Sequence, residues 1–250
     1  MRKERLEQII EFISDKGFVT MEQVREEFNI AMPTVRKDIS ELASQGLIEK
    51  VYGGAKAVKR QSKNRHLFRN RQGVQVEAKH EIAQKAAGIV SDGDVIYLDS
   101  GTTAAAIIEF IKDKHVTIIT SNMAAIMASA EMDNIDVYVL GGKFNRDTMS
   151  VDHADPANIL KEFNVHKAFM AATGYSIEGG LAQDSPTECG IKKHVMDIAS
   201  ETFLIIDSSK IGKKALIRYA DPDSIGTIIT DGKVEREYRE YFKANGINII

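Results

Sequence analysis

The chain has 250 residues, of which 43% are hydrophobic and 28% charged, and its formal net charge at pH 7 is −3. This length accommodates one small domain and one of ordinary size, and the composition is that of a globular protein rather than a disordered chain. No apolar run approaches the roughly 20 residues that span a bilayer, and the charged N-terminus MRKERLEQII is unlike a signal peptide. The single Cys189 excludes an internal disulfide, so we expect a cytoplasmic protein without membrane contact.

Two short helical patterns occupy the first 30 residues. The first ends at Gly17, a residue typical of a helix C-terminus, and its apolar stripe consists of Leu6, Ile9, Ile10 and Ile13. Thr20 predicts the start of the second helix, because Gln23 three residues later completes a capping box. Asn29 closes this helix.

The segment Met32–Ala55 predicts a third helix, which breaks at Gly46, and a hairpin. One side of the helix faces a small core, and the other presents basic and hydroxyl side chains, as in a helix that lies in a DNA major groove. A solvated surface helix would show the same pattern. A strand over Leu47–Tyr52 then turns at Gly53-Gly54, so residues 1–57 are predicted to form a winged helix-turn-helix. The DNA-binding candidates are Thr34, Arg36, Lys37, Ser40, Lys50, Tyr52 and Lys56.

The charges are unevenly distributed along the chain. Residues 1–72 hold 15 Lys and Arg against 10 Asp and Glu, a net of +5, whereas the remainder has a net of −8. Between Lys50 and Arg71 there are eight basic residues and no acidic one. Such a run forms a solvated linker or adds contacts to DNA phosphates. We predict a basic linker over residues 58–76, with a helical turn near His66–Arg71.

From residue 77 to 250 short apolar runs alternate with helical patterns. This order predicts an α/β domain with a parallel sheet that helices cover on both faces. Helices are expected over residues 78–90 and from Thr102 and Asn122. The predicted strands are Val95–Leu98, Val116–Ile119, Val137–Leu140, Ala168–Ala172, Phe203–Ile206, Ile225–Ile229 and Ile247–Ile250. Ligands of such sheets bind at the carboxyl ends of the strands.

Polar residues and glycines follow several of these strands. The segment 99–103 supplies hydroxyls and N–H groups that suit a phosphate, although an ordinary helix cap would look similar. The segment 207–210 supplies an acid and a lysine for a sugar phosphate, or forms a surface turn. Asn122 is equally well explained as a cap and Gly141-Gly142 as a turn, while Gly179-Gly180 predicts a mobile loop. The effector-binding candidates are Asp99, Ser100, Gly101, Thr102, Thr103, Ser121, Asn122, Gly141, Gly142, Thr173, Gly174 and Lys210.

In these motifs the sequence resembles the DeoR family of bacterial transcriptional regulators. The N-terminal matches are Gly17-Phe18-Val19-Thr20, Thr34-Val35-Arg36-Lys37-Asp38-Ile39, Gln45-Gly46-Leu47-Ile48 and Tyr52-Gly53-Gly54-Ala55. The later matches are Leu98-Asp99-Ser100-Gly101-Thr102-Thr103, Thr120-Ser121-Asn122, Leu140-Gly141-Gly142, Lys192 and Asp207-Ser208-Ser209-Lys210. The resemblance covers nearly the whole chain.

The resemblance implies a repressor of a carbohydrate-metabolism operon that a phosphorylated sugar releases from double-stranded operator DNA. The C-terminal domain would sense the sugar phosphate, form a dimer or tetramer, and share its fold with ribose-5-phosphate isomerase. By the same likeness, Ser100 to Thr103 would hold the phosphate, and Asp99, Asn122 and Lys210 would help to bind the sugar. Three positions depart from the family pattern. Ala31 and Tyr52 replace the usual serine and histidine, and His153 stands where a glycine is common.

Two other functions remain open at this stage. A sugar-phosphate isomerase or deaminase would need a carboxylate base, for which Glu178, Asp184, Glu188 and Asp207 qualify by type alone. An oligomeric DNA-binding scaffold would need no small-molecule effector. The six histidines show no spacing typical of a metal site, and we expect neither a metal nor a cofactor.

Overall fold

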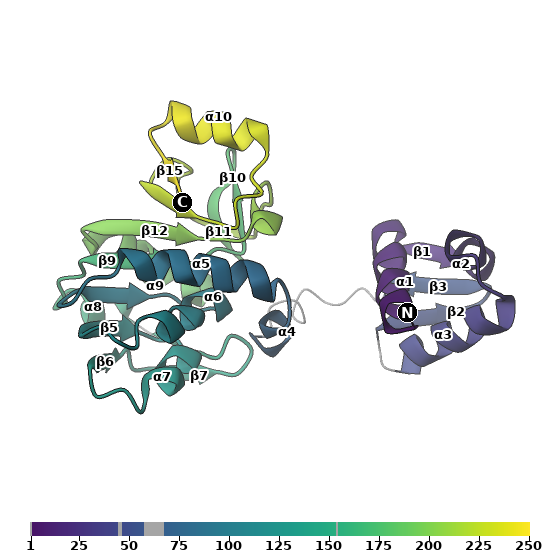
Figure 1. The fold of residues 1–250 in the computed structure, drawn as a ribbon, viewed down its shortest axis with the longest axis horizontal. Helices are drawn as coiled ribbons and strands as arrows, with labels where there is room; N and C mark the ends of the chain where they lie inside the picture. Colours follow the sequence, from purple (N-terminus) through teal and green to yellow (C-terminus); the bar gives the residue numbers. More distant parts are fainter. Residues whose placement is uncertain (1, 45–46, 58–67, 154) are drawn as a thin grey trace. The chain divides into compact units, whose positions relative to one another are not determined.

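The computed structural model describes residues 2–44, 47–57, 68–153 and 155–250, and the chain divides into two compact units. The units are Met1–Arg65 and His66–Ile250, and each has a hydrophobic core of its own (Figure 1). The helix break predicted at Gly46 and residues 58–67 of the predicted linker lie outside the described residues. In the described part of the chain, no helix combines the length and apolarity needed to cross a membrane.

The first unit is a winged helix-turn-helix, as predicted. Its elements are α1 (Arg2–Lys16), β1 (Phe18–Thr20), α2 (Met21–Phe28), α3 (Met32–Ser44), β2 (Ile48–Val51) and β3 (Gly54–Ala57). The capping box of Thr20 and Gln23 is present, and Asn29 closes α2 in the left-handed region at φ 46°. The strands form an antiparallel sheet in the order β1-β3-β2. Strand β1 was not predicted, because its three residues are too few to show an alternating pattern.

The second unit begins with α4 (Phe68–Gln72), which lies within the predicted linker, and α5 (Val76–Ile89). Its central elements are β4 (Val95–Leu98), α6 (Thr102–Ala106), η2 (Ile107–Phe110), β5 (Val116–Thr120), α7 (Met123–Ser129), β6 (Ile135–Val139), β7 (Lys143–Asn145) and β8 (Ser150–Asp152). Its last elements are α8 (Pro156–Leu160), β9 (Lys167–Met170), β10 (Gly174–Ser176), β11 (Gly180–Gln183), α9 (Pro186–Ile198), β12 (Glu201–Ile205), η3 (Ser208–Lys210), β13 (Ile217–Ala220), β14 (Thr227–Ile229), α10 (Arg236–Ala244) and β15 (Asn248–Ile249).

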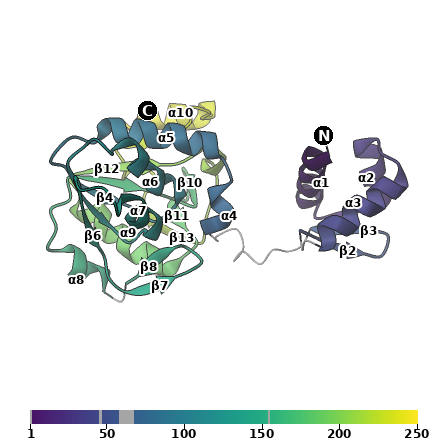
Figure 2. The same cartoon turned by 60° about the horizontal axis from the view of Figure 1, so that its bottom comes forward.

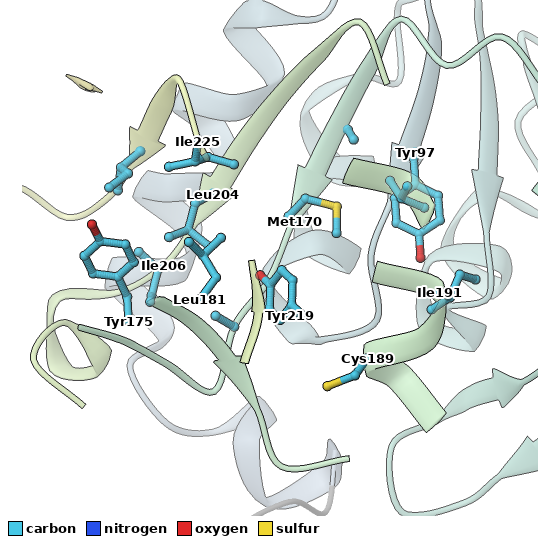
Figure 3. Packing of buried hydrophobic residues seen from close by; sticks show 14 of the residues in the cluster. Tyr97, Met170, Tyr175, Leu181, Cys189, Ile191, Leu204, Ile206, Tyr219 and Ile225 are labelled. Atoms are coloured by element: carbon cyan, nitrogen blue, oxygen red, sulfur yellow. The ribbon is translucent and has the colours of Figure 1, made fainter. Parts of the chain in front are cut away.

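A seven-stranded parallel sheet forms the centre of this unit, in the order β15-β14-β12-β9-β4-β5-β6. Alternate strand residues enter two different cores: Ile96 and Leu98 pack with α5, α6 and α7, whereas Tyr97 packs with α9 and α10. Figure 2 shows α5 and α9 on either side of the strands, and Figure 3 shows part of the second core around Tyr97 and Tyr219. The predicted parallel α/β fold is therefore confirmed.

Two predicted segments were wrong in detail. The strand expected at Val137–Leu140 lies at Ile135–Val139, two residues earlier at its start and one at its end. The mobile loop expected around Gly179-Gly180 is the hairpin β10–β11, which continues into β13 as a separate antiparallel sheet. Gly180 sits in this hairpin at φ +65°, where an added Cβ would lie 2.3 Å from the Ala220 carbonyl oxygen. The glycine therefore marks a close approach of two strands rather than a mobile loop.

Candidate functional site

The predicted DNA-reading surface lies on α3 and the β2–β3 wing. On α3, Arg36, Lys37 and Ser40 are exposed, and Thr34 is half-buried. The opposite side of α3 enters the core of the first unit through Val35, Ile39 and Leu42. Helix and wing are joined, since Lys50 Nζ donates to Ser40 Oγ at 2.9 Å. Tyr52 is fully exposed at the tip of the wing, and Lys56 is exposed on β3.

Asp38 is a buried acid on α3 that sequence reasoning did not single out. Arg5 of α1 donates to its carboxylate, with Arg5 Nε 3.0 Å from Asp38 Oδ2. The pair links α1 to α3 beneath the exposed basic face. Asp38 lies one helical turn from both Val35 and Leu42, on the apolar stripe of the predicted helix. An acid at such a position was the sequence signal that could have indicated a buried ion pair.

The predicted phosphate-binding segment forms the turn from β4 into α6. Gly101 adopts φ +136° at the N-terminus of α6, and no side chain caps this helix. By contrast, side chains of Asn122, Asp155 and Ser185 cap α7, α8 and α9. The hydroxyls of segment 99–103 therefore do not cap α6, and the anion contact expected of this segment remains a prediction.

Asp99 is fully buried and organises this turn. Its Oδ1 accepts from the Ser100 N–H at 2.8 Å, and its Oδ2 accepts from the Ala171 N–H at 2.7 Å. The Lys192 ammonium on α9 forms an ion pair with Oδ2 and donates to the Ala171 carbonyl at 2.9 Å. Burial raises the pKa of Asp99, while Lys192 opposes that effect. Both oxygens are thus engaged within the protein, so Asp99 holds the turn in shape.

Asn122 also positions backbone. Its amide nitrogen donates to the Asp99 and Gly101 carbonyls at 3.0 and 2.9 Å, and its oxygen caps α7. Gly142 is explained by packing, because an added Cβ would lie 2.2 Å from the Asp152 carbonyl oxygen. The effector contacts expected of Asn122, Ser121, Gly141 and Gly142 remain predictions.

A second polar network lies beside the turn. Glu188 on α9 is buried and accepts from the Ser100 hydroxyl and, at 2.7 Å, from Gln183 Nε2. Gln183 in turn accepts from the Thr173 hydroxyl at 2.8 Å. Gly174 is fixed by its neighbours, since an added Cβ would lie 2.4 Å from the Lys213 carbonyl oxygen. The structure thus links Ser100 to Thr173 through Glu188 and Gln183, which were not among the effector-binding candidates.

Three cations from different elements influence one another close to this turn. Lys210, 28% exposed, lies 3.4 Å from Asp207, and burial lowers its pKa, with Arg71 and Lys192 lowering it further. Burial likewise lowers the pKa of Arg71, which Glu188 and Asp99 counteract. Burial lowers the pKa of Lys79 to about 8, with Lys210 as the next cause. We call Arg71, Lys79 and Lys210 the cation cluster.

Helix α4 brings Arg71 to this place. The Phe68 N–H donates to the Asp147 carbonyl at 2.7 Å, and the Lys79 ammonium donates to the carbonyls of Arg71 and Val74. Arg71 Nε is buried without a hydrogen-bond partner among the described residues. A surface cavity of about 360 Å3 lies between α4, α5 and α6. It is lined by Phe68, Gln72, Lys79 and Thr102, among other residues.

Arg71, Lys79 and Gln183 were therefore missed as site residues, Glu188 was considered only as the base of an enzyme, and Lys192 was noted only as a family match. Lys79 and Lys192 had a signal, since each lies on the buried stripe of a helical pattern. Arg71 had none, because it ends a basic run that resembled a linker. Among the described residues, no group of three or more His, Cys, Asp and Glu is arranged to hold a metal.

Comparisons with known protein families match both units. A profile described as the DeoR-like helix-turn-helix domain matches residues 5–61, and one described as the DeoR C-terminal sensor domain matches residues 74–232. Helix α4 falls between the two.

Known proteins resemble the chain over nearly its full length. The chain is 34% identical over 250 residues to the HTH-type transcriptional regulator IolR of Bacillus subtilis, covering 100% of this chain and 99% of the relative. It is 31% identical to the lactose phosphotransferase system repressor of Streptococcus mutans, covering 92% and 93% of the two chains. Among solved structures, ribose-5-phosphate isomerase A from Methanocaldococcus jannaschii is similar over 54% of each chain, at 23% identity and a TM-score of 0.41.

Proposed function

Because the chain belongs to the DeoR family of helix-turn-helix transcriptional regulators, we propose that it represses a carbohydrate-metabolism operon until a phosphorylated sugar releases it from operator DNA. The first unit binds DNA, with α3 in the major groove. The name of the Streptococcus relative, the lactose phosphotransferase system repressor, supports repression as the direction of control and carbohydrate metabolism as its field.

The cation cluster beside the uncapped N-terminus of α6 carries the effector proposal. A phosphate there would accept from the first N–H groups of α6 and from Arg71 and Lys210, and it would supply the hydrogen-bond acceptor that Arg71 Nε lacks among the described residues. Asp99 and Asn122 would hold the turn, while Glu188 and Gln183 would face the sugar hydroxyls through the network that they share with Ser100. These donors and acceptors suit a phosphorylated sugar.

Release of DNA would follow from a change in the arrangement of subunits. A homodimer or homotetramer would present two α3 helices to half-sites about 34 Å apart, one turn of the double helix. To move the protein from almost fully bound to almost fully released, the effector must prefer the released arrangement by about 5.5 kcal/mol. Several charge-assisted hydrogen bonds to a phosphate, each contributing about 1.5–3 kcal/mol, are of that size.

The enzyme alternative has less support. The printed names of the relatives are those of regulators, and the carboxylates at the turn are already engaged: Asp99 with Lys192, and Glu188 with Ser100 and Gln183. We infer that the protein is not an enzyme and acts in the cytoplasm on chromosomal DNA. Incubation with a panel of sugar phosphates should give no turnover.

Paired variants test the two sites separately. Arg36→Ala should weaken operator binding about 10-fold to 100-fold, the value of one good base or phosphate contact, and leave sugar-phosphate affinity unchanged. Arg71→Gln should weaken sugar-phosphate binding about 10-fold to 100-fold, the loss of one charged hydrogen-bonding group, and leave operator binding unchanged. Operator affinity is measured by fluorescence anisotropy and sugar-phosphate affinity by calorimetry.

Glu77→Gln, at an exposed side chain of α5 outside the cation cluster, is the matched control and should change neither affinity. If Arg71→Gln binds every sugar phosphate as the wild type and Glu77→Gln do, the cation cluster is not the effector site. If the wild type binds operator DNA but no sugar phosphate, the protein is a DNA-binding scaffold.

A further inference from the structure

Helix α4 is held to the second unit at both of its ends. It has only five residues, and a helix of that length makes about one internal α-type hydrogen bond, so contacts with other elements must hold it. Its first N–H, at Phe68, donates to the Asp147 carbonyl oxygen at 2.7 Å. Near its other end, the Lys79 ammonium donates to the carbonyl oxygens of Arg71 and Val74. The Lys79 side chain therefore caps the C-terminal end of α4.

The packing around α4 is incomplete. Phe68 is buried and anchors the helix, but the cavity of about 360 Å3 lies between α4, α5 and α6. Small side chains of α6 and α7, among them Ala105 and Ala124, line part of this cavity. A helix beside a cavity makes fewer dispersion contacts than a helix in a close-packed core. Segments with few such contacts are those that open most readily in a folded protein.

The cation cluster places like charges at the end of α4. Burial is the main cause that lowers the pKa of Lys79, and the charges of Lys210 and Arg71 act in the same direction. Burial also lowers the pKa of Lys210, and the charge of Arg71 adds to that effect. Asp207, 3.4 Å from Lys210, opposes both shifts. Holding α4 in this position therefore costs electrostatic free energy, which a bound anion would offset.

The two acids that influence Arg71 most have other partners. Asp99 forms an ion pair with Lys192, and Glu188 accepts two hydrogen bonds from the neighbouring polar network. Arg71 Nε is buried and, within the described part of the chain, has no hydrogen-bond partner. Because α4 contacts α6, an anion bound by Arg71 would lie beside the turn 99–103.

We propose that residues 68–74, which we call the α4 clasp, open and close over the turn 99–103, and that a bound anion holds the clasp closed through Arg71. The identity of the anion as a sugar phosphate rests on the proposed function. Helix α4 is the first helix of the second unit, at the point where the chain arrives from the first. The clasp therefore converts occupancy of the site into a change in the segment that enters this unit.

Hydrogen exchange of the full-length chain, followed by mass spectrometry, tests the effect of the anion. The probes are inorganic phosphate and the sugar phosphates of the panel, each at ten times the dissociation constant that calorimetry gives. A ligand that binds only the closed clasp should slow exchange at residues 68–74 about tenfold, because it multiplies the closed population by one plus the ratio of its concentration to that constant. Exchange at residues 99–103 reports whether the site itself is occupied.

The two segments separate failure of the clasp from failure of the effector site. Slower exchange at 99–103 with no change at 68–74 would overturn the clasp and leave the effector site in place. No change at either segment with any of the probes would remove the effector site, and the clasp would fail with it.

Three variants test the clasp without any ligand, and each loses one positive charge. Lys210→Gln removes a cation that repels Arg71 and Lys79, so it should slow exchange at residues 68–74 about threefold to tenfold. Lys79→Gln removes the cap of α4 and should accelerate exchange there by a similar factor. Lys193→Gln, at an exposed side chain of α9, is the matched control and should change nothing.

The opposite signs expected of Lys210→Gln and Lys79→Gln distinguish the clasp from a merely structural role of these lysines. Loss of a structural lysine would accelerate exchange in both variants, and that result would overturn the proposal. Circular dichroism checks that all three variants remain folded.

Discussion

The ammonium of Lys79 is buried and donates to the carbonyls of Arg71 and Val74, next to the end of α4. Its pKa is lowered to about 8, mainly by burial and then by the nearby cations Lys210 and Arg71, while Asp207 has the opposite effect. The side chain therefore changes charge at a pH where a phosphate monoester stays a dianion, because the second pKa of the phosphate is about 6. Between pH 7 and 9, the charge that changes at the proposed site is therefore mainly that of Lys79.

We expect sugar-phosphate affinity to fall as the pH rises through 8. A bound dianion favours protonated Lys79, and if it raises the pKa of Lys79 by one unit, the affinity falls about fivefold between pH 7 and 9, which is about 1 kcal/mol. Calorimetry at pH 7, 8 and 9 measures this change. Lys79→Arg should show no such dependence, because arginine stays charged over this range. Equal wild-type affinities at pH 7 and 9 would contradict the assignment of Lys79 to the cluster.

The same depressed pKa affects the stability of the free protein in the opposite sense. The unfolded chain keeps its Lys79 proton up to about pH 10.5, the ordinary lysine value, whereas the folded chain loses it near pH 8. The unfolded state therefore binds more protons between these limits, and the contribution of Lys79 to stability rises with pH across that window. Below pH 8 both states carry the proton, so the burial penalty of the charged form is fully present.

At the scale of elements, the wing depends on one close approach of two strands. A Cβ on Gly54 would lie 2.2 Å from the Val19 carbonyl oxygen, whereas nothing lies within 4 Å of the corresponding position on Gly53. Gly54→Ala should therefore separate β1 from β3 and destabilise the first unit by at least about 1–3 kcal/mol, the usual cost of overpacking. Operator binding should fall with the wing. Thermal unfolding and anisotropy measure the two effects.

Gly53→Asn is the matched control. Gly53 adopts φ +80°, a region that asparagine tolerates better than other residues, and its surroundings are open. This variant should retain the fold and most of the operator affinity. If Gly54→Ala is as stable as Gly53→Asn, then β1 does not fix the wing in the way that the contact indicates.

The elements that the sequence predicted well are those with a clear period or a capped end. The apolar run Val95–Leu98 has the bounds of β4, and the Thr20–Gln23 capping box gave the start of α2. The elements that it missed include the helices α9 and α10 and short strands in which glycine replaces the alternating side chains, such as β10 and β11. Their positions depend on contacts with residues such as Lys213 and Ala220, which lie some 40 residues further along the chain.

The residues of the candidate site also fall into those that the local sequence predicted and those that it did not. Local chemistry predicted the segment 99–103 and Lys210, because hydroxyls, glycine and lysine follow strands directly. It did not predict Glu188 or Arg71, since their roles come from elements that the fold brings to the strand ends. Arg71 in particular belongs to a five-residue helix that is held by Asp147 and Lys79 rather than by its own sequence.

At the scale of the whole molecule, the chain consists of two units with separate cores. No residue of the first core belongs to either core of the second unit. We therefore expect two thermal transitions in a calorimeter rather than one. A sugar phosphate at 100 times its dissociation constant adds about 2.7 kcal/mol, which should raise the transition of the second unit by about 5–10 °C.

The transition of the first unit should not move with the sugar phosphate. An Arg36→Ala variant should show the same ligand-induced shift as the wild type, which separates ligand binding from DNA binding. A single cooperative transition, or a shift of both transitions, would mean that the units are thermodynamically coupled in the absence of DNA.

The amide of Asn122 has a mechanical consequence for the second unit. Its hydrogen bonds link the turn after β4 to the start of α7. Backbone hydrogen bonds from Met123 to Met149 and from Val151 to Ser121 link α7 to the β7–β8 hairpin. The loop of that hairpin is in turn bonded to the first residue of α4, through Asp147 and Phe68. These links make one stiff block of segments that are far apart in the sequence. A ligand bound at Gly101 would therefore restrain α4, the helix through which the chain enters this unit, through these links as well as through Arg71.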